Sequence, residues 1–97
     1  MLHLVFQSVL EQAIIQRIGS GDDVVFMENA VFRVYKDNIL SPELLKMLNN
    51  HINLYVLSED IETRGIQLNE LLLGIKVIDY SGLVQLTENN KVIMTWN

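Results

Sequence analysis

Short apolar runs alternate with amphipathic stretches along the chain, and this alternation restricts the possible folds more than any other feature. Five runs have the length and composition of strands: 2–6, 24–27, 52–57, 76–80 and 92–96. The stretches between them read as helices: 8–18, 29–36, 41–50, 58–64 and 81–90. Apolar strands that alternate with helices predict a parallel sheet with helices on both faces. We expect one domain over 1–97, with 66–75 fitting no single element.

Residues that favour helix starts stand at the head of several of these stretches. Ser8 and Glu11 have the spacing of a capping box. Ser41 is followed by the only proline of the chain, which suits the first position of a helix. Ser58 follows an apolar run and can cap the next helix, and Asn29 is a further candidate cap.

The stretch "LSEDIETRGI" at 57–66 concentrates acidic residues and raises the question of a catalytic or metal-binding site. Glu59 and Asp60 fall in the first helical turn, where the helix dipole favours negative charge. Arg64 follows Asp60 at the favourable i, i+4 spacing, and Gly65 suits a helix stop. Carboxylate chemistry needs a second, converging set of acids. None is evident, so we expect these charges to build a helix.

The composition and the missing motifs exclude several other functions. The net charge is −5, and seven basic residues form no cluster, so direct nucleic-acid binding is not expected. His3 and His51 have no companion ligands, and we predict no metal site. Gly19 and Gly21 lie between a helix and a strand, which is the wrong end for a phosphate-binding loop. We therefore expect no cofactor.

Neither a membrane span nor a signal peptide is expected. No apolar run approaches the ~20 residues that cross a bilayer. The start, Met1 to Phe6, lacks a basic segment and a sufficiently long apolar one. We expect a cytoplasmic protein.

Four segments together resemble the TusB/DsrH family of sulfur relay proteins. The resemblance rests on "MLH" at the start, "GDDVVFMENAV" at 21–31, "LYVLSEDIETRGI" at 54–66 and "VIDYSGLVQLTENNKVIMTW" at 77–96. It implies the DsrE/DsrF/DsrH-like fold, a three-layer α/β/α sandwich with a mostly parallel sheet of about five strands.

The same resemblance implies partners and a pathway. Family members assemble with TusC-like and TusD-like subunits into a heterohexamer, a dimer of trimers. That complex receives persulfide sulfur from TusA and passes it to TusE for 2-thiolation of the tRNA wobble uridine. Related DsrH proteins carry a cysteine near the end of the first helix. This chain has Gly19 and Ser20 in the corresponding region and no cysteine anywhere. A serine hydroxyl cannot form a persulfide, so we expect no catalytic residue and no enzymatic activity.

A subunit without catalytic residues contributes a surface that binds its partners. Aromatic, methionine and aliphatic residues are the candidates for such an interface. Phe32 lies off the face that Val31 and Val34 share, and Leu72 belongs to the run "LLLGI". Met94 and Trp96 stand near the C-terminal end. We predict that Phe32, Leu72, Met94 and Trp96 contribute to a partner interface. The alternative for each is the domain's own core.

A second class of function stays open at this stage. The expected carboxyl ends of the strands carry polar residues: Gln7, Glu28, Asn29, Ser58, Glu59 and Tyr80. Ligands of open α/β sheets bind at such ends. A homo-oligomeric small-molecule-binding or enzymatic domain of DsrE-like fold outside the relay is therefore the alternative. An isolated chain with an exposed apolar surface is also expected to self-associate.

Overall fold

The strands form one sheet in which every pairing between them is parallel. The computed structural model describes residues 1–6, 12–36 and 41–97. The strand order is β4-β3-β2-β1-β5, and neighbouring strands run parallel throughout. The strands are β1 (Leu2–Val5), β2 (Asp23–Phe26), β3 (Asn53–Leu57), β4 (Lys76–Ile78) and β5 (Ile93–Trp96). The expected five-stranded parallel sheet is confirmed.

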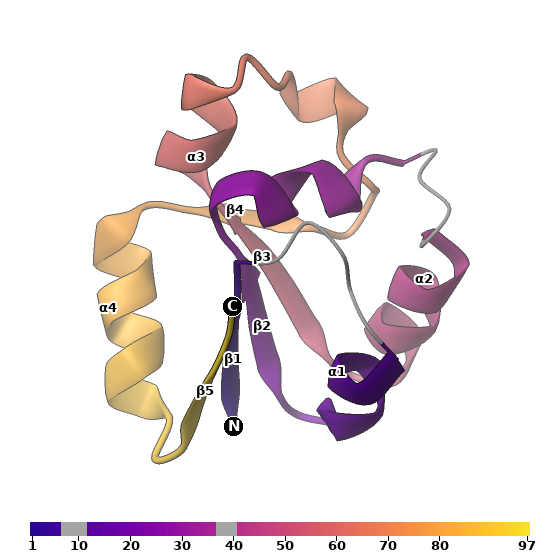
Figure 1. Ribbon diagram of the computed structural model, residues 1–97, viewed down its shortest axis with the longest axis vertical. Helices are drawn as coiled ribbons and strands as arrows, with labels where there is room; N and C mark the ends of the chain where they lie inside the picture. The colour runs from indigo at the N-terminus through magenta and orange to yellow at the C-terminus, as the bar shows by residue number, and fades with distance from the viewer. Residues whose placement is uncertain (7–11, 37–40) are drawn as a thin grey trace.

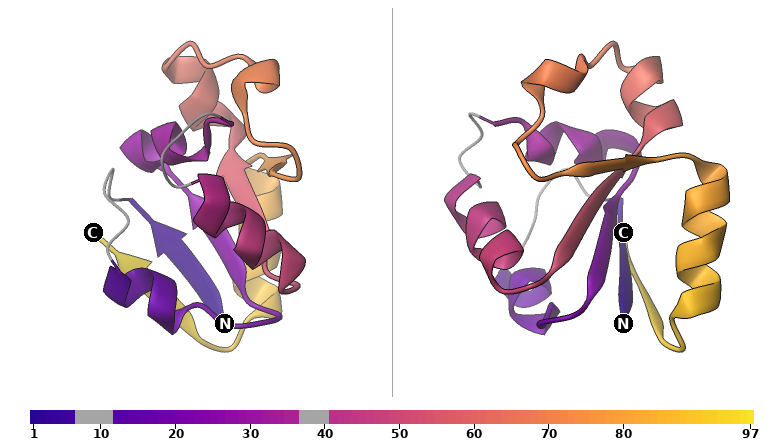
Figure 2. Two further views of the ribbon diagram at one scale, coloured as in Figure 1. Left: turned by 90° about the vertical axis from the view of Figure 1, so that its right-hand side faces the viewer. Right: turned by 180° about the vertical axis from the view of Figure 1, so that it is seen from behind.

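Helices cover both faces of this sheet, as the alternating pattern predicts. The helices are α1 (Gln12–Arg17), η1 (Glu28–Val34), α2 (Ser41–Asn49), α3 (Ser58–Thr63), η2 (Leu68–Glu70) and α4 (Tyr80–Asn89). In Figure 1, α1 and α2 lie on one side of the sheet and α4 on the other, and Figure 2 shows the same layers from two further sides. η1 and α3 lie beyond the carboxyl ends of the strands. The three-layer α/β/α sandwich is confirmed.

The main core lies between the sheet and the layer of α1 and α2. Alternate strand residues point to this side because side chains alternate along a strand. The strands supply Val5, Val24, Phe26, Leu54 and Val56, which are all fully buried. The helices add Ile14, Ile18, Leu44 and Met47. The opposite strand faces supply fewer buried residues, namely Leu2, Val25 and Leu57.

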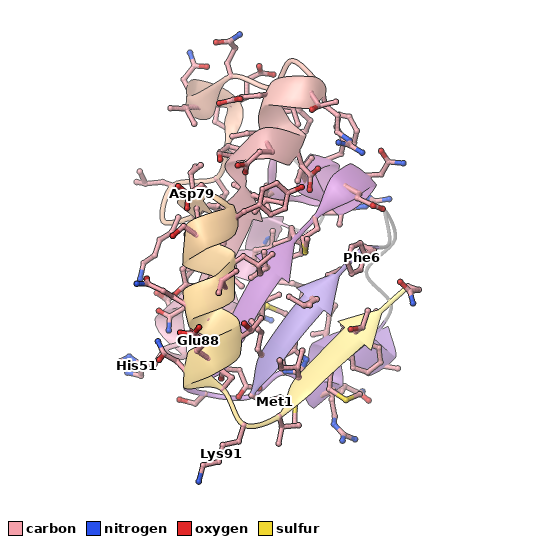
Figure 3. All side chains as sticks on the ribbon, turned by 90° about the vertical axis from the view of Figure 1, so that its left-hand side faces the viewer. Met1, Phe6, His51, Asp79, Glu88 and Lys91 are labelled. Carbon is pink, nitrogen blue, oxygen red and sulfur yellow. The ribbon has the colours of Figure 1, made fainter. Side chains whose placement is uncertain are left out.

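α4 gives the second face of the sheet an incomplete cover. It connects β4 at one edge to β5 at the other edge, so it must cross the whole face. None of its residues is fully buried. Figure 3 shows α4 in front of the sheet, with β5 at the sheet edge beside it. Ile93 of β5 is accordingly 42% exposed.

Several predicted helix starts differ from those that the structure shows. Asn29 is not a cap, because η1 is a 3₁₀ helix that follows Met27. Ser58 is the first residue of α3 and donates from Oγ to Glu59 at 2.9 Å, so it is not the cap either. α4 begins at Tyr80 because Asp79 accepts a hydrogen bond from the Gly82 amide, which also ends β4 at Ile78.

Two further predictions concern short stretches. Residues 66–75 contain η2 and then a single antiparallel bridge between Leu71 and Tyr35. The capping box at Ser8 lies outside the described residues. Among the residues that are described, no helix has the length and apolar character needed to cross a membrane.

Candidate functional site

The acidic stretch after β3 holds two helices together at the carboxyl edge of the sheet. Asp60 accepts a hydrogen bond from the Glu28 amide at 2.7 Å, and its other oxygen lies 3.6 Å from Arg64. The Arg64 Nε donates to the Asn29 side chain at 3.0 Å. Gly65 takes the left-handed φ of 68° expected of a helix stop. The i, i+4 pair is confirmed, and these charges connect α3 to the start of η1.

Most strand-end residues of the small-molecule alternative are engaged in local contacts where η1 meets α3. Ser58 and Glu59 bond each other, whereas Glu28 and Asn29 are tied to α3. Tyr80 is mostly exposed. Gln7 lies outside the described residues. Within 1–6, 12–36 and 41–97, no three or more histidine and carboxylate side chains are placed to hold a metal ion.

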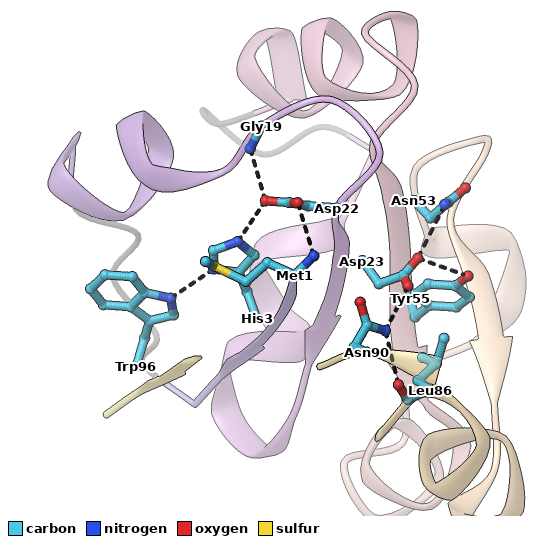
Figure 4. Close-up of polar contacts among 10 residues, drawn as sticks. All are labelled: Met1, His3, Gly19, Asp22, Asp23, Asn53, Tyr55, Leu86, Asn90 and Trp96. Carbon is cyan, nitrogen blue, oxygen red and sulfur yellow. Dashed lines mark hydrogen bonds and ion pairs between the residues drawn. The ribbon is translucent and has the colours of Figure 1, made fainter. Parts of the chain in front are cut away.

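The turn between α1 and β2 is organised by the Asp22 carboxylate. It accepts hydrogen bonds from the Gly19 amide at 3.0 Å and from His3 Nε2 at 2.9 Å, and it pairs with the Met1 ammonium at 3.2 Å (Figure 4). Burial alone raises the pKa of Asp22. The bonds from Gly19, His3 and the ammonium outweigh burial and hold the pKa below its usual value. Ser20, in the same turn, is exposed.

His3 is fully buried and is bonded through both ring nitrogens. Its Nδ1 lies 3.1 Å from the indole Nε1 of Trp96. An indole N–H can only donate, so Nδ1 must accept and the proton of the neutral ring sits on Nε2. That proton is then donated to Asp22. This chain of bonds joins β5, β1 and the start of β2, and it gives His3 a structural role.

A second polar cluster fixes the end of α4 over the sheet. Asp23 accepts hydrogen bonds from Asn53 at 3.1 Å, from Tyr55 at 3.4 Å and from Asn90 at 3.1 Å (Figure 4). Asn90 also donates to the Leu86 carbonyl, which closes the helix. Burial raises the pKa of the Tyr55 phenol, and the Asp23 charge and hydrogen bond raise it further.

The residues predicted for a partner interface lie in two separate places. Leu72 is only 7% exposed and belongs to the main core, and the Leu72 amide donates to Val34 at 2.7 Å. Phe32, in the neighbouring η1, is 37% exposed. Met94 and Trp96 lie on β5, where they share a strand face with His3 and Val5. Trp96 packs partly buried against the core. Their contact with a partner stays a prediction.

Two features of the same region were not singled out from the sequence. Arg33 of η1 has a buried Nε without a hydrogen-bond partner in the described chain. Leu73 and Leu68 are 91% and 67% exposed beside the buried Leu72. Sequence patterns give little signal for either feature, because a helical arginine is ordinarily solvated and a leucine run ordinarily enters the core.

Comparison with known proteins gives consistent matches along the chain. The family model described as "DsrH like protein" matches residues 5–93. Protein TusB of Buchnera aphidicola subsp. Baizongia pistaciae is 31% identical over 99 residues, which cover 99% of this chain and 100% of the relative. Protein TusB of Erwinia tasmaniensis is 33% identical with the same coverage.

Solved structures support the fold independently. The protein MTH1491 of Methanobacterium thermoautotrophicum superposes with a TM-score of 0.78 at 14% identity, over 97% of this chain and 95% of that one. The ychN protein of E. coli superposes with a TM-score of 0.78 at 13% identity, over 98% of this chain and 97% of that one. These identities support the fold alone, whereas the family model and the TusB relatives match in sequence. The chain belongs to the DsrH family.

Proposed function

We propose that this chain is a non-catalytic subunit of a TusBCD-type sulfur relay complex. The observation that carries the proposal is the match to TusB proteins over the whole chain, together with the absence of cysteine. Carrying sulfur as a persulfide requires a thiol, because the thiolate is the nucleophile that accepts the sulfur atom. A chain without cysteine therefore supports the transfer through its surface and its contacts.

The partners in this proposal are TusC-like and TusD-like subunits, in a heterohexamer built as a dimer of trimers. The complex takes sulfur from a TusA-type carrier and delivers it to TusE in the cytoplasm. The product is 2-thiouridine at the tRNA wobble position. Large apolar side chains exposed on the described surface, among them Leu73 and Leu68, support a role in assembly.

Co-expression with the TusC and TusD homologues from the same genome tests the assembly. We expect all three chains to co-purify at 1:1:1 through a tag on any one of them. If TusC and TusD assemble fully and this chain stays monomeric beside them at micromolar concentration, the proposal is wrong.

The role in tRNA modification has its own test. Deletion of the gene in its native host should lower wobble 2-thiouridine, measured by mass spectrometry of digested tRNA. Re-introduction of this chain should restore it. An unchanged 2-thiouridine level would leave the chain outside this relay and would favour the homo-oligomeric small-molecule alternative, which a thermal-shift screen with nucleotides and flavins then addresses.

A further inference from the structure

His3 is a buried ionisable side chain whose two ring nitrogens meet partners of opposite kind. The side chain is 0% exposed, so water cannot replace either partner. Its Nε2 lies 2.9 Å from Oδ2 of Asp22, and its Nδ1 lies 3.1 Å from Nε1 of Trp96 (Figure 4). An ionised carboxylate only accepts a hydrogen bond, and an indole N–H only donates one. The ring therefore has to carry its proton on Nε2 and keep the lone pair of Nδ1 for Trp96.

A second proton on this ring would break the bond to Trp96. Both nitrogens of the imidazolium form are donors. The Nδ1–H would then face the indole N–H across the same 3.1 Å, and neither hydrogen would have an acceptor. Buried donors without an acceptor are unfavourable. The protonated form of His3 and the present position of the Trp96 side chain therefore exclude each other.

The Asp22 side of the ring favours the added charge. Nε2 donates to Asp22 in both the neutral and the protonated form, so this bond survives protonation. The Gly19 amide and the Met1 ammonium also bond the Asp22 carboxylate and help to keep it ionised. A buried charge beside an opposite charge is tolerated far better than an isolated one. The cost of protonation therefore falls on the Trp96 bond.

The other elements around His3 bring no second charge to it within the described residues. The strand residues beside it in register are uncharged: Val24 on β2 and Met94 on β5. On the helical layer that faces it, Arg17 of α1 is exposed, and Glu43 and Lys46 of α2 contact each other at 3.8 Å. Asp22, with the Met1 ammonium on its other oxygen, is therefore the charged group that His3 meets.

Trp96 holds the end of an edge strand. β5 is the last strand of the sheet and pairs on one side only, with β1. The Trp96 carbonyl accepts a hydrogen bond from the Phe6 amide at 3.0 Å, and the side chain packs partly buried against the core. Segments with few buried contacts open locally at a lower cost than the centre of a domain. Loss of the His3 bond should therefore free the end of β5 while the other strands stay folded.

We propose that His3 and Trp96 form a proton-sensitive latch on the end of β5, which is closed while His3 is neutral and opens when its ring takes up a proton. The closed form binds one proton fewer than the open form, so a falling pH favours opening. Histidine is the side chain that ordinarily changes charge near neutral pH. The latch goes beyond the proposed function, and it makes the surface that β5 presents depend on pH.

The unmodified chain allows a direct test, because it contains one tryptophan and two histidines. Its tryptophan fluorescence reports on Trp96 alone, and NMR shifts of the imidazole rings report the protonation of each histidine. From about pH 8 to about pH 5 we expect the Trp96 emission to move to longer wavelength in step with protonation of His3. Amides of β2 and β3 should stay protected from hydrogen exchange, which separates opening from unfolding. The control His51→Gln, at the exposed histidine, should behave like the unmodified chain.

Two variants should change the latch in opposite ways. His3→Asn places an amide oxygen near the position of Nδ1 and cannot take up a proton, so the Trp96 emission should stay constant over this pH range. Trp96→Phe removes the indole N–H that occupies Nδ1. His3 should therefore take up its proton at a higher pH in Trp96→Phe than in the unmodified chain.

Each measurement has an outcome that overturns the latch. A constant Trp96 emission while His3 becomes protonated would show that the two events are not coupled. Protonation of His3 at the same pH in Trp96→Phe and in the unmodified chain would show that the indole does not oppose it. If His3 stays neutral until the whole chain unfolds, the latch is wrong and the ring has a structural role only. Should His3→Asn fail to fold, the unmodified chain and Trp96→Phe still decide the question.

Discussion

Single polar residues connect parts of this small domain that are far apart in the chain. Asp22 receives bonds from the Met1 ammonium, His3 and Gly19, so one carboxylate ties the start of β1 to the end of α1. Trp96 extends this network to β5 through His3. The charged form of Asp22 is what these donors stabilise, and the stability of the fold therefore depends on its ionisation.

We expect Asp22→Asn to lower the free energy of unfolding by about 1–3 kcal/mol at pH 7. The folded-state pKa of Asp22 lies below its unfolded value, so its contribution is present above the unfolded pKa and is lost as the pH falls through the folded pKa. The difference between the variant and the unmodified chain should therefore shrink as the pH falls below about 4, the ordinary pKa of an aspartate, and through the lower folded-state pKa. Denaturant unfolding followed by the fluorescence of Trp96 measures the loss of unfolding free energy and its dependence on pH. Glu62→Gln, which removes an exposed charge, should show no such difference.

Among the elements, α4 depends most on its ends. It has no fully buried residue, so packing holds it less firmly than the other layer. Its first turn is closed by Asp79, which accepts from the Gly82 amide at 2.9 Å. Its last turn is closed by Asn90, which also bonds Asp23 of β2. Local hydrogen bonds therefore set the position of the helix that covers the second face.

Removal of the Asp79 cap of α4 should lower the stability of the fold by a measurable amount. We expect Asp79→Ala to destabilise the fold by about 0.5–2 kcal/mol, because an orphan amide of the first turn loses its acceptor. Asp79→Asn keeps a side-chain oxygen and should retain most of the stability. Amide hydrogen exchange of α4 should rise in Asp79→Ala before exchange of β1 and β2 does. Equal stability of the alanine and asparagine variants would show that the cap does not hold this helix.

At the scale of the whole molecule, apolar surface is exposed in two places: beyond the carboxyl ends of the strands and on the side of the sheet that α4 covers. Phe32, Leu68 and Leu73 lie on η1, η2 and the following turn, and Val84 and Ile93 lie on α4 and β5. Isolated apolar side chains are normal on a protein surface, but gathered ones mark sites of association. A chain that works as a subunit exposes this surface when its partners are absent.

The isolated chain is therefore expected to self-associate reversibly as its concentration rises. Sedimentation velocity from micromolar to millimolar concentration should give a weight-average mass that climbs above 11.1 kDa. The double variant Leu68→Ser with Leu73→Ser should self-associate only at higher concentration, since it lacks two exposed leucine side chains. A constant monomeric mass over the whole range would contradict the expectation.

The layered fold was predictable because periodicity is a local property of the sequence. Each predicted apolar run falls at a strand of the structure; "VVF" lies in β2 and "NLYVL" forms β3. Helix starts were less predictable, because the cap depends on where the backbone turns. α4 begins at Tyr80 after the cap Asp79, one residue before the predicted stretch 81–90, and Met27 rather than Asn29 precedes η1.

The sequence by itself determined the α/β class, the parallel sheet and the family, and it excluded a persulfide on this chain because no residue carries a thiol. Tertiary structure alone decided which leucines of "LLLGI" are buried: Leu71 and Leu72 enter the core, and Leu73 next to them is exposed. It also decided that the buried Nε of Arg33 has no hydrogen-bond partner within the described residues and that His3 meets Trp96 across 93 positions of sequence. The physical reason is that patterning fixes local conformation, whereas burial and polar partners depend on which distant segments the fold brings together.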